Sequence, residues 1–227
     1  MESDNGVEVT KIEMTLLFFI FSTSLLFFTY NLLEHSTIRI ETKDKKIIYI
    51  DPYLIDTETK DADIILITHE HFDHCSPEDV KKIMKEDTII FTEKYCAKIL
   101  SVINSSDIKI VKPGDYLNIA NIVIRVVPAY TSKLHHIKEK GYLGFVLEIE
   151  DARLYYMGDS QVASSYGYGA DILFLPVDGI WTMSVSDAVL LAKSIEAKNI
   201  IPIHLKFSET GRELSKNLLK QLKDLKQ

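Results

Sequence analysis

Hydrophobic positions along this chain form two successive batches of strand-like segments, and helix-like segments accompany each batch. The run 64–67 is wholly apolar, which is typical of a strand buried on both faces. Ser76 can cap a helix that begins at Pro77, a residue suited to a first helical turn. The first batch predicts strands at residues 28–33, 37–41, 46–50, 64–67 and 88–91, and helices from residue 77 and over residues 93–100.

The second batch repeats this arrangement. Ser184 and Asp187 mark a helix start, and the apolar residues that follow fall on one face. Thr210 and Glu213 form a capping box that opens a last helix with a leucine stripe. We expect strands at residues 108–111, 121–127, 144–149, 153–157, 171–176 and 200–203, and helices at 184–197 and from Thr210 onward.

Strands followed by helices, twice, predict a fold of the α/β (α+β) class. Two mixed sheets packed face to face, with helices outside both, would bury all the apolar faces. This arrangement is a four-layered αββα sandwich. No repeat or linker divides the chain after residue 34, so we expect one domain over residues 28–227 behind an apolar extension, residues 1–27.

The N-terminal apolar stretch allows several interpretations. Residues 14–33 carry no charge and are just long enough to span a bilayer. Only Lys11 is basic before them, which makes a poor signal peptide, and a strand at 28–33 would leave too short a span. A membrane anchor or uncleaved signal, a packed extension or misassigned start, and a cleaved signal stay open. We expect a cytoplasmic protein, with membrane association through residues 14–33 as the alternative.

Composition narrows the function classes. Of 227 residues, 46% are hydrophobic and 26% charged, which is too apolar for general disorder. The formal net charge of −7 disfavours a protein whose main partner is nucleic acid. The two cysteines, Cys75 and Cys96, do not make a disulfide framework, and we expect both to be small buried residues.

The segment Thr68-His69-Glu70-His71-Phe72-Asp73-His74 concentrates metal-binding side chains. It lies between a buried strand and a capped helix, so it forms a loop at the carboxyl end of a strand, where ligands gather in α/β folds. Imidazole and carboxylate suit Zn²⁺, Mn²⁺ or Fe²⁺. In an extended loop His69 and His71 point the same way and can share one metal, whereas Asp73 and His74 can serve a second.

This His-x-His-x-Asp-His pattern after an apolar strand resembles the metallo-β-lactamase superfamily, over roughly residues 28–205. Gly158-Asp159-Ser160 and Pro202-Ile203-His204 resemble two further superfamily motifs. Leu33-Glu34-His35-Ser36 and Ile50-Asp51-Pro52 resemble motifs of the ascorbate-6-phosphate-lactonase-like branch. The resemblance implies the metallo-β-lactamase fold, and it implies a dinuclear metal site.

The resemblance also implies roles for single residues. The first metal would be held by His69, His71 and His136, the second by Asp73, His74 and His204, with Asp159 bridging both. His136 is preferred to the alternative His135, because it precedes Ile137-Lys138 where the branch usually has Pro-Lys. Asp159 and Asp73 would be the catalytic carboxylates, Asp159 by holding the metals and Asp73 by accepting a proton.

Other residues are expected around the metals. We expect His35 to line the pocket or to orient a ligand rather than to bind metal, and Asp51 to orient a ligand histidine or to serve as a turn carboxylate. Pocket-lining candidates are Tyr130, Tyr142, Phe145, Trp181 and Met183. Glu34, the stretch 137–139 and the stretch 177–179 depart from the branch pattern, and these departures bear on the substrate.

Together these observations predict a metal-dependent hydrolase. Two Zn²⁺ ions, with Mn²⁺ or Fe²⁺ as alternatives, would share a bridging hydroxide that attacks an ester, a lactone or a phosphorylated small molecule. A phosphodiesterase or ribonuclease of the same superfamily is the first alternative. A membrane-tethered metal-binding protein with little catalysis is the second. The sequence predicts no oligomeric state.

Overall fold

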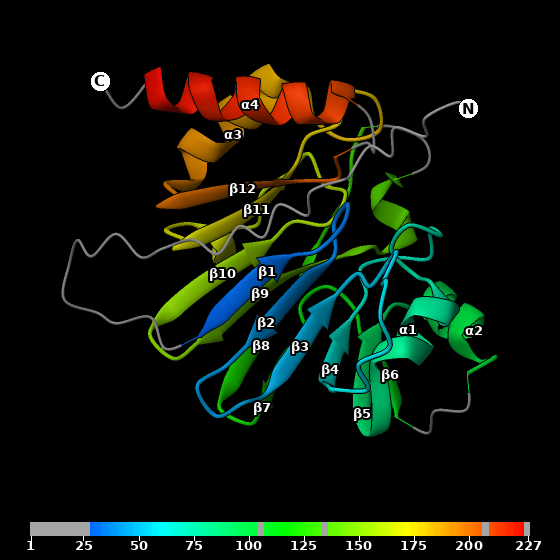
Figure 1. The fold of residues 1–227 in the computed structure, drawn as a ribbon. Coiled ribbons are helices and arrows are strands. Elements are labelled where there is room, and N and C mark those ends of the chain that lie inside the picture. Colours follow the sequence, from blue (N-terminus) through cyan, green and yellow to red (C-terminus); the bar gives the residue numbers. More distant parts are fainter. Residues whose placement is uncertain (1–27, 104–106, 133–135, 206–208, 225–227) are drawn as a thin grey trace, which may run out of the picture.

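The computed structural model describes residues 28–103, 107–132, 136–205 and 209–224 (Figure 1). The strands in these ranges are β1 (Thr29–Leu32), β2 (Ile38–Glu41), β3 (Ile47–Ile50), β4 (Ala62–Leu66), β5 (Met84–Thr92), β6 (Ile108–Ile110), β7 (Tyr116–Ile119), β8 (Ile122–Pro128), β9 (Leu143–Ile149), β10 (Ala152–Tyr156), β11 (Ile172–Pro176) and β12 (Asn199–Ile203). The helices are α1 (Pro77–Ile83), α2 (Lys94–Leu100), α3 (Val185–Ile195) and α4 (Glu209–Asp224), with short 3₁₀ turns η2 (Lys138–Lys140) and η3 (Ser165–Gly167).

The strands form two mixed sheets, ordered β1-β2-β3-β4-β5-β6 and β12-β11-β10-β9-β8-β7. Apolar side chains from both sheets make the central core, including Ile40, Leu66, Phe145 and Phe174. A second apolar layer joins α3 and α4 to the second sheet, and a third joins α1 and α2 to the first. Helices therefore lie outside both sheets (Figure 1), and the predicted αββα sandwich is confirmed.

Each strand predicted from the sequence has a counterpart in the structure, including β1 within residues 28–33. Strand β7 was not predicted, because its positions alternate between exposed and half-buried and give no strong apolar signal. The last helix begins at Glu209, so Thr210 lies inside it rather than before it. Ser76 and Ser184 cap α1 and α3 as predicted, each accepting from the amide three residues on.

One edge of the sandwich collects the loops that carry the histidines. Strands β3, β4 and β5 run parallel in the first sheet, and β10, β11 and β12 run parallel in the second. Parallel strands end at the same edge of a sheet. The amide of Leu143 donates to the carbonyl of Thr68 at 3.0 Å, which ties the loop after β4 to the start of β9.

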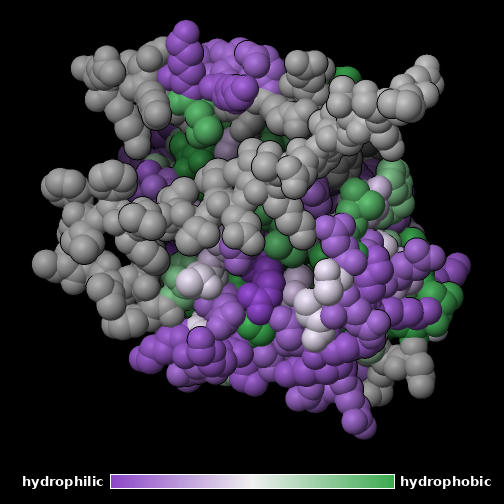
Figure 2. Space-filling view, viewed as in Figure 1, coloured by the Kyte–Doolittle hydropathy of each residue, from purple (hydrophilic) through white to green (hydrophobic). Residues whose placement is uncertain are grey.

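Over the lower part of the view, where β3–β5 and α1 lie, the surface is mainly hydrophilic (Figure 2). Within the described ranges no helix combines the length and the apolarity that crossing a membrane requires. The predicted anchor lies in residues 14–33, of which 14–27 fall outside the described ranges, and the boundary at residue 28 stays a prediction.

Cys75 and Cys96 are buried, as expected, but they form a disulfide, which the sequence did not predict. The bond links the residue after His74 to helix α2 and spans a sequence separation of 21. Two cysteines with an intervening helix and strand give no pairing signal, because only the folded chain brings α2 beside the loop after β4.

Replacing both cysteines with serine is expected to lower the free energy of unfolding by about 3 kcal/mol, because a loop of this length loses its cross-link in the unfolded chain. Thermal unfolding followed by circular dichroism measures the change, which corresponds to a Tm lower by roughly 6–12 °C. A thiol reductant should lower the Tm of the wild type and leave the double variant unchanged. Coincident unfolding curves for the two proteins would contradict the expectation.

Candidate metal centre

Five loops deliver the site residues to one place. His69, His71, Asp73 and His74 follow β4, Asp159 follows β10, and His204 follows β12. His136 lies after β8, and His35 lies in the turn between β1 and β2. These side chains form two groups, and within each group the possible ligand atoms all lie within 4.8 Å of one another. The groups are His69, His71, His136 and Asp159, and His35, Asp73, His74 and His204.

In the first group three imidazole nitrogens converge. His69 Nε2 lies 3.0 Å from His71 Nδ1 and 3.4 Å from His136 Nε2. Asp159 Oδ2 lies 3.4 Å from His136 Nε2 and 3.8 Å from His69 Nε2. The structure thus brings the predicted first-metal residues together with His136. The alternative, His135, lies outside the described residues.

The second group gathers around Asp73. Its Oδ2 lies 3.6 Å from His204 Nε2, 3.9 Å from His74 Nε2 and 3.1 Å from His35 Nε2. The residues predicted to bind the second metal therefore lie close together, and His35 contacts them.

Asp159, a member of the first group, also contacts the second. Its Oδ1 lies 3.4 Å from His74 Nε2, and its Oδ2 lies 3.1 Å from His204 Nε2 as well as near the first group. The preceding Gly158 permits this approach: its φ is +56°, and a Cβ there would lie 2.8 Å from the carbonyl oxygen of Leu143. Only glycine can hold Asp159 so close to the loop after β4.

Asp51 supports both groups from behind. This fully buried carboxylate accepts from the amide and the hydroxyl of Thr68, each at 2.8 Å, and from the hydroxyl of Tyr156 at 2.8 Å. His74 Nδ1 lies 2.7 Å from Asp51 Oδ2, so His74 can donate there and turn Nε2 toward Asp159. Of the two roles considered for Asp51, the geometry favours orienting a ligand histidine.

The same logic holds for His69. The Thr68 hydroxyl donates its proton to Asp51, so it accepts from His69 Nδ1, 2.8 Å away. His69 Nε2 then has a free lone pair, and this lone pair is directed at His71 and His136. A donor on one ring nitrogen and a lone pair on the other is the arrangement that metal-binding histidines adopt in proteins.

Asp178 was not predicted as a site residue. Its Oδ2 lies 3.0 Å from His204 Nδ1, while its Oδ1 accepts from the amides of Ile180, Trp181 and Thr182 at 2.8–2.9 Å. Asp178 is therefore a charge partner of His204, whereas Asp51 makes a hydrogen bond with His74. The sequence drew attention to residues 177–179 only as a departure from the branch pattern.

Glu70 and Tyr142 form a further support. Glu70 accepts from the Tyr142 hydroxyl at 2.7 Å and from Lys140 Nζ at 3.3 Å. The Tyr142 ring packs on His69, with ring centroids 4.8 Å apart. Tyr142 is thus a buried wall of the site rather than a freely exposed pocket residue. Phe145 and Met183, also proposed as pocket residues, are fully buried in the core layers.

The pKa directions divide the histidines. Burial lowers the pKa of His69 well below its ordinary value and lowers that of His71. Burial acts the same way on His74 and His204, but the carboxylate of Asp159 and its acidic neighbours outweigh it. They raise the pKa of His74 to about 10 and that of His204 well above its ordinary range. In the absence of metal, protons on these two histidines balance the buried acids.

The donor set fits divalent cations. His74 Nε2 and Asp159 Oδ1 are buried and have no hydrogen-bond partner among the described residues. Burial opposes the charge on Asp159, yet His204 and His74 hold its pKa well below the ordinary value, so it is an anion. Buried lone pairs that converge on buried carboxylates suit Zn²⁺, Mn²⁺ or Fe²⁺, which would displace the protons.

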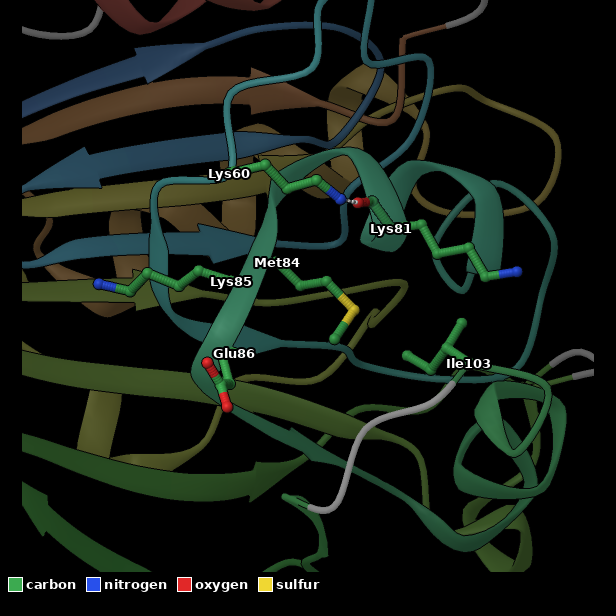
Figure 3. A pocket seen from close by; sticks show the side chains of 6 residues that line it. All are labelled: Lys60, Lys81, Met84, Lys85, Glu86 and Ile103. Carbon is green, nitrogen blue, oxygen red and sulfur yellow. Dashed lines mark hydrogen bonds between the residues drawn. The ribbon is translucent and has the colours of Figure 1, made fainter.

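A surface hollow of about 560 Å³ lies elsewhere, lined by Lys60, Lys81, Met84, Lys85, Glu86 and Ile103 (Figure 3). It lies beside the start of β5, at the opposite end of the first sheet from the loop after β4. Lys60 donates to the carbonyl of Lys81, and Lys85 donates to Asp63 at 2.8 Å, so these two ammonium groups are occupied. We place the functional site at the histidine groups.

Comparison with known proteins agrees with this geometry. Residues 29–204 match the family model described as Beta-lactamase superfamily domain. A UPF0173 metal-dependent hydrolase from Methanosphaera stadtmanae is 30% identical over 194 residues, which cover 75% of this chain and 80% of that protein. A protein of the same description from Bacillus subtilis is 26% identical over 189 residues, covering 75% of this chain and 82% of its own length.

Among solved structures, a Parabacteroides distasonis protein assigned as a metal-dependent hydrolase superimposes with a TM-score of 0.70 at 30% identity, covering 85% of this chain and 88% of that one.

Proposed function

Because this chain belongs to the metallo-β-lactamase superfamily, and within it to the UPF0173 metal-dependent hydrolase family, we propose that it hydrolyses a small molecule with two bound divalent cations. The membership makes it a metal-dependent hydrolase. Zinc is the metal we propose, and an ester, a lactone or a phosphorylated metabolite is the substrate class. The likeness to the ascorbate-6-phosphate-lactonase-like branch is part of this proposal.

One observation carries the proposal: the two histidine groups share Asp159. Its oxygens lie 3.4 Å from His136 and 3.4 Å from His74, one histidine from each group. Two cations held by such a pair of groups supply Lewis acidity and activate water near neutral pH. The residues of the chain hold the two groups next to each other and exclude bulk water from Asp159. They also keep one ring nitrogen of each histidine, Nε2 or Nδ1, directed at the other site residues.

Asp73 is the residue we propose for moving a proton. It is only partly buried, and its Oδ2 lies 3.6 Å from His204 Nε2 and 3.1 Å from His35 Nε2. A partly exposed carboxylate beside the metal ligands can accept a proton from an attacking water and release it to the leaving group.

Exposed apolar side chains support a small organic substrate. Phe72, within the metal loop, is 73% exposed and contacts the ring of Tyr53 edge-on. Ile180 and Trp181 are 50% and 49% exposed and follow Asp178, whose carboxylate faces His204. Large apolar side chains this exposed beside a polar site suit contact with an apolar part of a ligand.

Chelation is expected to abolish hydrolysis, and metal add-back is expected to restore it. The protein should be purified, analysed for metals, and assayed against a panel of aryl esters, lactones, phosphodiesters and a β-lactam before and after treatment with a chelator. We expect turnover of an ester or lactone that falls to background without metal and returns with Zn²⁺, Mn²⁺ or Fe²⁺. Full turnover by metal-free protein would contradict the proposal, and turnover of phosphodiesters alone would favour the nuclease alternative.

A further inference from the structure

Lys138 is an exposed lysine two residues after His136, at the start of the short turn η2. Its Nζ lies 5.8 Å from the centre of the Tyr130 ring, a distance at which an aromatic face attracts a cation. The carbonyl of Lys138 accepts from the amide of Gly141 at 3.1 Å, which closes the turn. The loop that supplies His136 therefore also places an ammonium group over an aromatic ring.

The other lysine of this turn is used differently. Lys140 Nζ lies 3.3 Å from an oxygen of Glu70, so its charge is balanced by the residue between His69 and His71. Among the residues that the structure describes, no carboxylate forms an ion pair with Lys138. Lys138 thus presents, on a loop of the candidate metal centre, a positive charge that no described acid balances.

Hydrogen bonds fix Tyr130 beside the loop that follows β10. Its amide donates to the hydroxyl oxygen of Ser160 at 3.3 Å, and its carbonyl accepts from the amide of Gln161 at 3.0 Å. Ser160 directly follows Asp159, the carboxylate that contacts both histidine groups. The ring beneath the Lys138 ammonium is therefore anchored to the neighbour of Asp159, which places this cation at the border of the candidate metal centre.

Gln161 connects this region to the loop after β11. Its side-chain oxygen accepts from the amide of Ser132 at 3.3 Å, and its side-chain nitrogen donates to the carbonyl of Thr182 at 3.0 Å. Trp181, the neighbour of Thr182, is 49% exposed. Three loops are thus joined into one wall, which carries the aromatic surface of Tyr130 and Trp181. The segments of this aromatic wall are residues 130–132, 160–161 and 181–182.

The chemistry of Lys138 matches an anion of low charge. An ammonium group offers one positive charge and three N–H donors, which suits the two oxygens of a carboxylate. A phosphate group carries about two negative charges near neutral pH and needs more than one cation to balance it. The formal net charge of the chain, −7, also opposes a dianion more strongly than a monoanion. A carboxylate is therefore favoured over a phosphate.

We propose that Lys138 binds a carboxylate of the substrate, so that the enzyme prefers esters or lactones that carry a second, unreactive carboxylate. This inference deepens the proposed function and rests on it. The ion pair with Lys138 positions the reacting carbonyl beside the histidine groups, and the exposed indole of Trp181 contacts the apolar part of the molecule. The second carboxylate takes no part in bond breaking and leaves unchanged with the product.

Ligand binding to the metal-free protein tests Lys138 without requiring catalysis. The full-length wild type, Lys138→Gln, Lys138→Arg and Lys193→Gln should be treated with a chelator and titrated with benzoate, benzamide and phenylphosphonate by NMR. Lys138→Gln should weaken benzoate binding about tenfold more than benzamide binding, because it removes one charge-assisted hydrogen bond. Lys138→Arg keeps the charge and should keep most of the affinity for benzoate.

Lys193→Gln is the matched control, because it removes the same charge from another exposed lysine. Lys193 lies in the last turn of α3, which leads to the start of β12, whereas His204 follows the end of that strand. The control should bind benzoate as the wild type does. Circular dichroism on each variant verifies that the fold is intact.

Turnover by the metal-loaded proteins tests the consequence for specificity. 4-Carboxyphenyl acetate and 4-carbamoylphenyl acetate differ mainly in charge, so they form a matched pair of esters. Lys138→Gln should lower kcat/KM for the charged ester about tenfold more than for the neutral one. Lys193→Gln should leave the ratio of the two kcat/KM values as it is in the wild type.

The remaining outcomes separate this inference from the proposed function. If benzoate does not bind the wild type, or binds Lys138→Gln equally well, the role of Lys138 is wrong even where both esters are hydrolysed. A larger effect of Lys138→Gln on phenylphosphonate than on benzoate overturns the choice of a carboxylate. Lys138-dependent benzoate binding by a protein that hydrolyses neither ester supports the binding role and contradicts the hydrolase proposal.

Discussion

Replacing Asp159 with asparagine is expected to lower kcat/KM by at least about a thousandfold, which is about 4 kcal/mol of transition-state stabilisation, while the fold persists. Asp159 is 4% exposed, and its oxygens approach histidines of both groups. The amide has the same shape but no charge, so it cannot balance two cations or bridge them. Both metal sites should weaken together, because the carboxylate contacts histidines of both groups.

Steady-state kinetics on the ester or lactone identified for the wild type measures this loss, and metal content measured alongside shows whether both ions leave. His69→Ala is the companion variant, because His69 lies in the first group alone. It should lower activity by orders of magnitude while leaving the second ion bound. Wild-type kinetics for Asp159→Asn at full metal loading would refute the bridging role of this carboxylate.

Most residues of the candidate site could be predicted from one local motif and from the family resemblance. His69, His71, Asp73 and His74 are contained in a single loop, whereas Asp159 and His204 were inferred from motifs that resemble those of the superfamily. Residues that act by long-range contact were harder to predict. Asp178 faces His204 from a different loop, and nothing in the segment 177–179 identifies it as a partner of that histidine.

The position of His35 is a second contact between distant residues that the sequence does not reveal. A single histidine in a turn between short strands is typical of a pocket wall, and its sequence gives no sign of Asp73, which is 38 residues away. Only the pairing of β1 with β2 and the packing of the two sheets bring this turn beside the end of β12. The fold was predictable from apolar periodicity together with the family resemblance, whereas the contacts between residues of the two sheets needed the three-dimensional structure.

Asp51 shows how the fold and the metal site depend on one carboxylate. It directly follows β3, it is fully buried with a φ of +47°, and its hydrogen bonds reach the loop after β4 and strand β10 of the other sheet. It therefore stabilises the contact between the sheets and the orientation of His74 at once. A substitution here should affect stability even without metal, unlike a substitution of a residue that only binds metal.

Asp51→Ala is expected to lower the free energy of unfolding of the metal-free protein by about 3–5 kcal/mol, because it leaves the buried donors of Thr68, Tyr156 and His74 without their acceptor. It should also weaken metal binding by about 10- to 100-fold, because His74 loses the contact that orients it. Urea unfolding in the presence of a chelator gives the first quantity, and chelator competition gives the second.

Asp63→Ala is the matched control, because Asp63 also accepts three hydrogen bonds, from the Ile47 amide, Lys46 and Lys85. The two lysines are partly exposed, so water can replace Asp63 as their acceptor. The control should therefore lose only about 1 kcal/mol of stability and keep wild-type metal affinity. If the two variants lost equal stability and neither lost metal affinity, Asp51 would act only as a turn carboxylate. An acceptor that links the two sheets and orients His74 cannot be removed without lowering both the stability and the metal affinity.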